Sequence, residues 1–380
     1  MRRNGENLIK RIRDGMRSQD RNKDFVINLD FKRSDPSCPP NISQGHFPSL
    51  DGFRAISIMF VLIGHCYHDI YPFVTGSFGV QFFFVISGFL ITTLLLKEKE
   101  NYGRVSLRKF YIRRFLRIFP VAYLFLLILF FVGLACKVSI EPNEFFSSLF
   151  YVRNTSILEV TGHYTGHYWS LSLEEQFYVL FPIMLVRNVK RYAATVFVLL
   201  ICLPLINYAS FHYVAHVPIV NHVAEIMRGM TPILTGSLFA VLNFYGKIKI
   251  EVRPGLKAFV SLLILLSASY VHTKLLRFGN TFLLASSLLI GVLILISIET
   301  DKNPRNYFYR FLNHPYMCKI GVLSYSLYIW QQIFTLYKPW KGLSVFTDNQ
   351  MVNLLALVVV SYASYHFYER RFLNLKTRFA

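Results

Sequence analysis

The chain has 380 residues, of which 53% are hydrophobic and only 16% charged, and its mean hydropathy is +0.39. Soluble domains carry about 25% charged residues, so this composition excludes an ordinary soluble globular protein. The net charge of +20 is typical of nucleic-acid-binding proteins, but the basic residues cluster between apolar segments, and we expect no nucleic-acid partner. Five scattered cysteines favour neither a disulfide framework nor a zinc site, and we expect no metal.

The first 46 residues are polar and basic and contain no apolar core, which is unlike a cleaved signal peptide. We expect residues 1–46 to be a basic, loosely ordered cytosolic tail.

The remaining chain alternates between polar connections and apolar segments of roughly 17 to 22 residues, the length a helix needs to cross about 30 Å of hydrocarbon. Lipid offers the backbone no hydrogen-bond partner, so such segments must be helices. We predict an all-α integral membrane protein, a bundle of about ten transmembrane helices. The predicted spans are 54–71, 78–96, 118–136, 172–187, 191–209, 229–245, 256–271, 279–298, 316–336 and 350–368.

The distribution of positive charge orients this bundle. Ten spans place both termini on one side, and the connections on that side, with the C-terminal tail, hold 22 Lys and Arg against 7 in the opposite connections. Cytosolic connections carry the excess of Lys and Arg, so we predict that both termini are cytosolic in a multi-pass protein of the cell membrane, the inner membrane in a bacterium. Residues 47–372 would form the transmembrane domain and 373–380 a short cytosolic tail.

Arg54 and His65 are candidates for chemistry in the first span. They are eleven residues apart, which places them on one helical face about 16 Å apart along the axis. An ionisable residue inside a span is costly and usually faces protein or a water-filled cavity. Asp69, one turn further, is placed to orient the His65 ring as a base, although a hydrogen-bonded structural histidine and an aspartate at a helix end explain these residues equally well.

One further group lies inside the second span, and another lies at the start of the third. Ser87 and Gly88 would let a neighbouring helix or a ligand approach the backbone closely, and packing is the simpler interpretation. Arg114 and Arg117 form an i,i+3 pair beside Arg113, so their guanidinium groups can converge on a phosphate. An ordinary basic anchor at the membrane surface is the alternative.

The segment before the fourth span contains Trp169, Glu174 and Glu175. Ser172 with Glu175 fits a capping box, which is a sufficient structural reason for both residues. Two carboxylates at the lip of a span also favour an acid or an acceptor-binding site.

Taken together, these residues resemble the membrane acyltransferase-3 family, which includes bacterial O-antigen and exopolysaccharide O-acetyltransferases. The resemblance runs in family order from residue 50 to the C-terminal region. Its pieces are Leu50–Arg54 with His65, Gly79-Val80, Phe83–Phe89, Arg113-Arg114 with Arg117-Ile118 and Pro120, Trp169–Ser172 with Glu174–Tyr178, Ser324–Trp330, and Glu369. Gln81, Gln331 and Arg371 depart from the common family pattern, which bears on subgroup and acceptor.

The resemblance implies a ten-helix bundle with a path for acyl-CoA that opens to the cytosol. It implies that Arg54 and His65 form the family's R-x₁₀-H motif, with His65 catalytic, and that Arg114 and Arg117 hold the CoA phosphates. We expect Arg113 beside them to contribute to CoA binding as well. Asp69, Ser87, Trp169, Glu174 and Glu175 would then support the acceptor site.

We therefore expect an O-acyltransferase that moves an acyl group, acetyl in the first instance, from cytosolic acyl-CoA to a hydroxyl of an exported or cell-surface carbohydrate or glycolipid. Acyl-CoA is then a co-substrate, and no tightly bound cofactor is expected. Alternatives from other classes are a transporter or flippase of a glycan or lipid intermediate, and a non-catalytic membrane scaffold. The charged residues inside spans that mark transporters are scarce here.

Overall fold

The computed structural model of the chain describes residues 26–27, 49–67, 70–71, 74–155, 158–213, 218–250, 252–275, 283–298, 307–342 and 345–379. Helices dominate these residues, and two-residue strands β1 (Val26–Ile27) and β2 (Ile248–Lys249) pair antiparallel. Side chains of residues 207, 209–228 and 274–275, among others, also lie outside the description.

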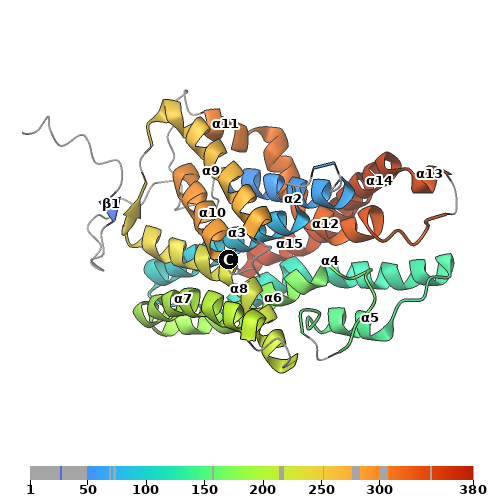
Figure 1. Cartoon of the computed structure of the whole chain (residues 1–380), viewed down its shortest axis with the longest axis horizontal. Helices are drawn as coiled ribbons and strands as arrows, with labels where there is room; N and C mark the ends of the chain where they lie inside the picture. Colours follow the sequence, from blue (N-terminus) through green and yellow to red (C-terminus); the bar gives the residue numbers. More distant parts are fainter. Residues whose placement is uncertain are drawn as a thin grey trace, which may run out of the picture.

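Each of the ten predicted spans overlaps one helix of the bundle in Figure 1. In chain order these helices are α2 (Leu50–Cys66), α3 (Gly76–Tyr102), α4 (Leu107–Cys136), α6 (Tyr168–Arg187), α7 (Val189–Tyr213), α8 (Pro218–Phe244), α9 (Pro254–Leu275), α10 (Leu283–Ile298), α12 (Pro315–Thr335) and α14 (Gln350–Ala363). Shorter helices are α5 (Pro142–Leu149), α11 (Tyr307–Leu312), α13 (Val345–Asp348) and α15 (Arg370–Lys376), with the π-helical turn η4 (Ser364–Glu369) and the 3₁₀ turn η5 (Thr377–Phe379).

Five helical segments of the described chain are long and apolar enough to cross a membrane: Gly76–Tyr102, Leu107–Cys136, Val189–Ile206, Gly255–Thr273 and Gln350–Phe379. The apolar stretches Gly229–Phe244 and Leu283–Ile298 are shorter. Helices α6 and α12 carry Ser, Gln and Glu residues in their inner turns, which lowers their hydropathy. The count of ten spans and the cytosolic termini stay predictions.

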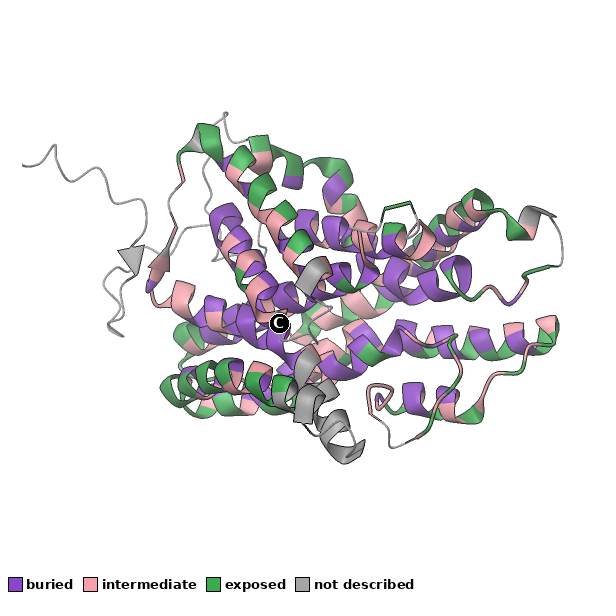
Figure 2. Ribbon diagram, viewed as in Figure 1, coloured by how far each residue is buried: buried purple, intermediate pink, exposed green. Residues whose placement is uncertain are grey.

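The outer surface of the bundle supports its membrane character. Helices α4, α7, α9 and α14 expose large apolar side chains, of which Phe131, Phe197, Leu266 and Val359 are examples. Figure 2 colours the exposed residues of these helices green. A water-soluble protein rarely exposes such continuous apolar surface, whereas lipid accepts it. The interior holds the two apolar cores of the bundle.

Close helix contacts set the geometry of the centre. A β-carbon at Gly88 of α3 would collide with the carbonyl of Ile233 in α8, and one at Gly236 of α8 would collide with the carbonyl of Val85 in α3. Small residues let helix backbones approach in this way, which confirms the packing role predicted for Gly88. Helix α2 lies between α3 and α12, and these neighbours decide what its polar residues can contact.

The bundle has two ends, which are named here after Arg54 and His65 at the start and the end of α2. The Arg54 end holds the start of α2, the start of α4 and the end of α3, and the His65 end holds the end of α2, the starts of α3 and α6 and the end of α12. The segment 137–167, of which the structure describes residues 137–155 and 158–167, contacts the His65 end through His163. There Gln332 Nε2 donates to the carbonyl oxygen of His163 at 2.8 Å, and the His163 ring stacks on Tyr337 with a centroid distance of 4.9 Å.

Candidate functional site

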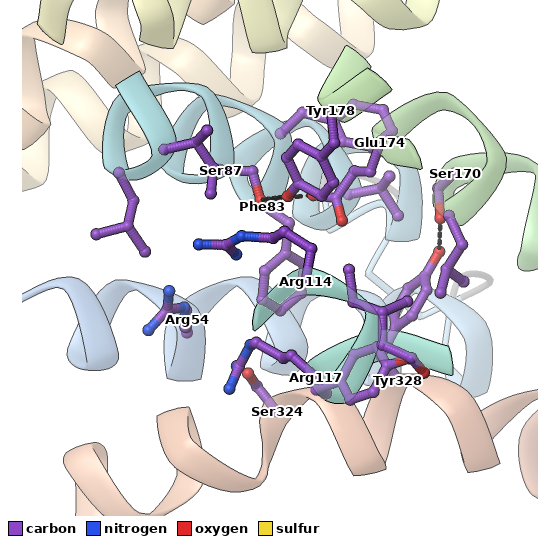
Figure 3. Close-up of a pocket in the computed structure, with 17 residues that line it drawn as sticks. Arg54, Phe83, Ser87, Arg114, Arg117, Ser170, Glu174, Tyr178, Ser324 and Tyr328 are labelled. Atoms are coloured by element: carbon purple, nitrogen blue, oxygen red, sulfur yellow. Dashed lines mark hydrogen bonds between the residues drawn. The ribbon is translucent and has the colours of Figure 1, made fainter. Parts of the chain in front are cut away.

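A pocket lies between α2, α3, α4, α6 and α12, and it contains about 740 Å³ of empty space, including open solvent at its mouth. Arg54, Arg114 and Arg117 line it on one side, and Ser170 and Tyr328 line it on the other (Figure 3). These elements come from distant parts of the sequence, so the pocket depends on the tertiary fold.

Three guanidinium groups gather at the Arg54 end of this pocket (Figure 3). Arg54 pairs with Asp51 in its own helix at 2.6 Å, whereas Arg117 lies within repulsive reach of both other arginines. Three cations close together, of which Arg54 forms an ion pair with Asp51, favour the binding of an anion at this end. Arginine is suited to phosphate because its planar fork donates two parallel hydrogen bonds.

Arg114 is the most deeply enclosed of the three. Its guanidinium carbon lies 5.7 Å from the ring centroid of Phe110 and 5.5 Å from that of Tyr178. Its Nε is buried and has no hydrogen-bond partner among the described residues. A buried donor normally finds an acceptor, so the Nε of Arg114 is available to donate to a group that enters the pocket.

The start of α4 explains why the predicted pair faces the pocket. Ser106 caps the helix by accepting from the backbone N–H of Lys109 at 3.4 Å, and Arg114 and Arg117 follow three residues apart on one face. Arg113 points elsewhere: it pairs with Glu98 at 2.8 Å and donates to the carbonyl oxygen of Phe379 at 2.8 Å. The CoA role of Arg113 stays a prediction, and its side chain does not line the pocket.

Polar groups from α3 and α6 meet in the middle of the pocket. Ser87 donates to Glu174 Oε1 at 2.5 Å, and the Tyr178 hydroxyl donates to Ser87 Oγ at 3.3 Å (Figure 3). Glu174 also lies within electrostatic reach of Arg54, Arg114 and Arg117. Ser87 thus has a place in the pocket wall in addition to the packing role considered from the sequence.

The predicted capping box is wrong. Helix α6 begins at Tyr168, four residues before Ser172, so Ser172 lies inside it and donates to the carbonyl oxygen of Tyr168 at 2.8 Å. The S-x-x-E pattern is equally compatible with a helix interior, where a serine hydroxyl bonds back to residue i−4. As a result Glu174 sits about two turns into the helix and not at its lip.

The other predicted support residues lie outside the pocket lining. Trp169 is 38% exposed and meets Phe84 edge-on with a centroid distance of 5.8 Å. Glu175 does not line the pocket, although it lies within electrostatic reach of Arg114, and one of its carboxylate oxygens is buried and unpartnered within the described chain. Asp69 lies outside the described residues, so its role beside His65 stays a prediction.

His65 occupies the opposite end of α2 from Arg54 and does not line the pocket. Its Nδ1 is 2.7 Å from Oε1 of Gln331 in α12. Its Nε2 lies beside Gly76, the first residue of α3, where an added β-carbon would be 2.7 Å from that nitrogen. The ring is also within electrostatic reach of His167, whose carbonyl oxygen accepts from the Tyr328 hydroxyl of the pocket at 3.4 Å.

Sequence reasoning did not place Gln331 or Gly76 at His65, although it noted Gln331 as a departure from the family pattern. A polar residue inside an apolar span was the available signal for Gln331. Across the described residues, no group of three or more His, Cys, Asp or Glu side chains is placed to hold a metal ion. The predictions of no metal and no tightly bound cofactor stay untested.

The arrangement of arginines, Ser87, Glu174 and His65 lies within the part of the chain that matches a family model described as an acyltransferase domain, residues 47–365. The chain belongs to the acyltransferase-3 family. This confirms the family predicted from the motifs.

Relatives within this family are named O-acetyltransferases. The peptidoglycan O-acetyltransferase OatA of Listeria monocytogenes is 27% identical over 367 residues, which covers 86% of this chain and 56% of the relative. The O-acetyltransferase OatA of Staphylococcus aureus (strain NCTC 8325 / PS 47) is 26% identical over 377 residues, which covers 90% of this chain and 58% of the relative. The chain therefore spans little more than half the length of these relatives, and no solved structure matches it.

Proposed function

We propose that this membrane protein transfers an acetyl group from cytosolic acetyl-CoA to a hydroxyl of a carbohydrate on the far side of the membrane. The observation that carries the proposal is the pocket with three guanidinium groups at one end and, beyond its other end, a histidine on the same helix as Arg54. Family membership and the names of the relatives support the acyl group and a carbohydrate acceptor.

The donor would bind with its phosphates at the Arg54 end. Arg114 and Arg117 would supply charge-assisted hydrogen bonds to phosphate oxygens, and Arg54 would add a third positive charge. The acyl-bearing arm of CoA would then run along Ser87, Glu174 and Tyr178 toward the His65 end. Glu174 would limit how far the phosphates enter, because its carboxylate occupies the middle of the pocket.

His65 would act as the general base. Neutral imidazole takes the proton from the acceptor hydroxyl as that oxygen attacks the thioester carbonyl carbon, the carbon–sulfur bond breaks, and the CoA thiolate takes the proton from the imidazolium. The acetyl group alone crosses the membrane on this route. We favour direct attack over a covalent acyl-His65 intermediate because a bound hydroxyl needs only a base.

Mass spectrometry of surface glycans tests the proposal. Cells that lack the gene should lose one acetyl mass from a defined sugar, the wild-type gene should restore it, and genes with His65→Ala or His65→Gln should not, although the variants insert and bind CoA normally. Near-normal acetylation by His65→Ala would exclude the catalytic assignment, and His167 with Glu174 would be examined next. A glycan lost from the surface as a whole would favour a transporter.

Radiolabelled acetyl-CoA without acceptor separates the two routes. Direct attack predicts no stable label on the protein. Label that depends on His65 would reject direct attack in favour of the acyl-histidine route.

A further inference from the structure

Gln331 is buried without exposed surface inside α12, where a glutamine needs partners for all its polar atoms. Its Oε1 is 2.7 Å from His65 Nδ1 and accepts from the Thr335 hydroxyl at 3.0 Å. Its Nε2 donates to Gln332 Oε1 at 3.3 Å. Every polar atom of the amide group is thus engaged, and one of its bonds goes to the histidine of the proposed reaction.

A backbone carbonyl fixes the direction of this chain of hydrogen bonds. The carbonyl oxygen of His163 can only accept, so Gln332 must present its NH₂ group there, at 2.8 Å. Gln332 Oε1 therefore faces Gln331 and requires the NH₂ group of Gln331. Oε1 of Gln331 is left facing His65, and an oxygen without a proton leaves His65 Nδ1 only the role of donor.

We propose that Gln331 is a positioning residue that holds His65 as the tautomer with the proton on Nδ1, so that Nε2 carries the lone pair for proton abstraction. The inference rests on the proposed role of His65 as the base. Nε2 lies beside Gly76, and no described residue forms a hydrogen bond with it. The segment 137–167, through His163, thereby sets which nitrogen of His65 reacts.

A second histidine in the same bundle shows what a purely structural version of this contact looks like. His272 Nδ1 is 2.6 Å from Oε1 of buried Gln81, whose Nε2 donates to the carbonyl oxygen of Leu283 at 2.9 Å. The Nε2 atom of His272, however, is 2.9 Å from the Ser77 hydroxyl. Both nitrogens of His272 are occupied, whereas His65 has one nitrogen held and the other left open.

The neutral amide orients His65 and can stabilise its charged form only through this one hydrogen bond, because the amide carries no net charge. A carboxylate at this position would accept the same hydrogen bond and would also stabilise the imidazolium by charge. The titratable group of the neighbouring elements that reaches His65 electrostatically, within the described chain, is the His167 ring at the start of α6. A new negative charge at position 331 should therefore shift the pH dependence of the reaction.

Nitrogen NMR of ¹⁵N-histidine-labelled full-length protein in bilayers tests the tautomer without relying on activity. The wild type should show a histidine signal with protonated Nδ1 and unprotonated Nε2 that disappears in His65→Gln, whereas the corresponding signal of His272, whose Nδ1 also faces a glutamine oxygen, should remain. Gln331→Leu should abolish the preference for this tautomer. A His65 signal protonated on Nε2 in the wild type would overturn the inference, whatever the activity measurements give.

Kinetics test the positioning role. Gln331→Leu should lower kcat about tenfold or more with little change in KM for acetyl-CoA, because the base is misoriented while the donor site is intact. Gln331→Glu should keep activity and move the acid limb of the kcat/KM profile to higher pH. Gln81→Glu, which places a carboxylate beside His272, is the matched control and should leave that limb where it is.

The two proposals fail in different ways. If His65→Ala remains active, His65 is not the base and the proposed function needs another catalytic residue. If His65→Ala is inactive but Gln331→Glu leaves the acid limb unmoved, the base is correct and the positioning role of Gln331 is wrong.

Discussion

Arg114 differs from its neighbours in what surrounds its guanidinium group. It packs between the rings of Phe110 and Tyr178 and keeps a buried Nε without a partner among the described residues, whereas Arg113 is already paired with Glu98. At the scale of single residues, this contrast between a satisfied and an unsatisfied arginine is the reason that we assign Arg114, and not Arg113, to the proposed donor site.

Arg114→Ala should weaken acetyl-CoA binding by about 1.5–3 kcal/mol, the usual contribution of a charge-assisted hydrogen bond. Arg117→Ala should act similarly, and Arg114→Lys should rescue only part of the loss because lysine lacks the planar fork. Titration calorimetry of purified protein measures the affinity. Exposed Arg108→Ala on the same helix is the matched control, and equal losses in all variants would refute a specific phosphate site.

Arg113→Ala tests the remaining part of the phosphate prediction. Its guanidinium bridges Glu98 and the carbonyl of Phe379, so we expect a lower melting temperature and a smaller loss of donor affinity than for Arg114→Ala. A loss of affinity as large as that of Arg114→Ala, measured by the same calorimetry, would place Arg113 at the donor after all.

Gly76→Ala is a second sharp test at this scale. The new methyl group would lie 2.7 Å from His65 Nε2, which is inside van der Waals contact, and would displace the imidazole from its present position beside Gln331. Because the obstacle is a side-chain ring and not backbone, the helices should still pack. We expect lost acetylation with normal acetyl-CoA affinity; normal acetylation would mean that Nε2 is not the reacting atom.

At the scale of elements, two glutamates with opposite electrostatics hold the start of the segment 137–167 to its residues 161–165. Glu141 accepts from the backbone N–H groups of Gly162 and Thr161, both at 2.8 Å, and these bonds hold its pKa below its ordinary value of 4.5. Glu144 is fully buried, and burial raises its pKa although the N–H of Thr165 donates to it at 2.7 Å.

The two carboxylates should therefore respond oppositely to pH. A lowered folded pKa means that Glu141 stabilises the segment above the ordinary carboxyl pKa and that this is lost as pH falls through the folded value. A raised folded pKa means that Glu144 contributes fully below the ordinary pKa and loses this contribution as pH rises. Glu141→Gln should reduce hydrogen-exchange protection of residues 159–165 at neutral pH, and Glu144→Gln should preserve or increase it. Identical effects of the matched substitutions would contradict this assignment.

The long helices could be predicted from the sequence because the length of an apolar segment can be read directly from it. Inside lipid, such a segment must also satisfy its backbone hydrogen bonds within itself, which requires a helix. The spacing of Arg54 and His65, and of Arg114 and Arg117, could be predicted for the same reason, since helical geometry is local. What could not be predicted was register between helices. Gln331 meets His65 because α12 packs on α2 at one particular offset along the helix axes. The residues 316–336 taken alone do not show what that offset is.

Local patterns also failed where two structures satisfy them equally. The capping box at Ser172 and the helix-interior hydrogen bond to Tyr168 use the same residues, and the actual start of α6 decides between them. That start is set four residues earlier, where Tyr168 packs without exposed surface and donates to the carbonyl oxygen of Ala122 at 2.6 Å. A tertiary contact overrides the local signal.

At the scale of the whole molecule, the proposed reaction requires the two ends of the bundle to face different compartments. The Arg54 end must meet cytosolic acetyl-CoA, and the segment 137–167 must meet the acceptor. The charge asymmetry of 22 against 7 basic residues points the same way. Orientation is therefore the property on which both the donor site and the acceptor site depend.

Cysteine labelling in intact cells tests this orientation. Glu159 precedes α6 and Lys190 lies in the first turn of α7, just after α6; both are exposed, so Glu159→Cys and Lys190→Cys are a matched pair across one helix. With the native cysteines replaced by serine, a membrane-impermeant maleimide should label only the Glu159 variant in intact cells and both variants after lysis. Reporters that work only outside the cytosol should stay dark when fused to either terminus. Labelling of Lys190→Cys in intact cells, or a bright C-terminal fusion, would overturn the ten-span topology and with it the cytosolic position of the arginine pocket.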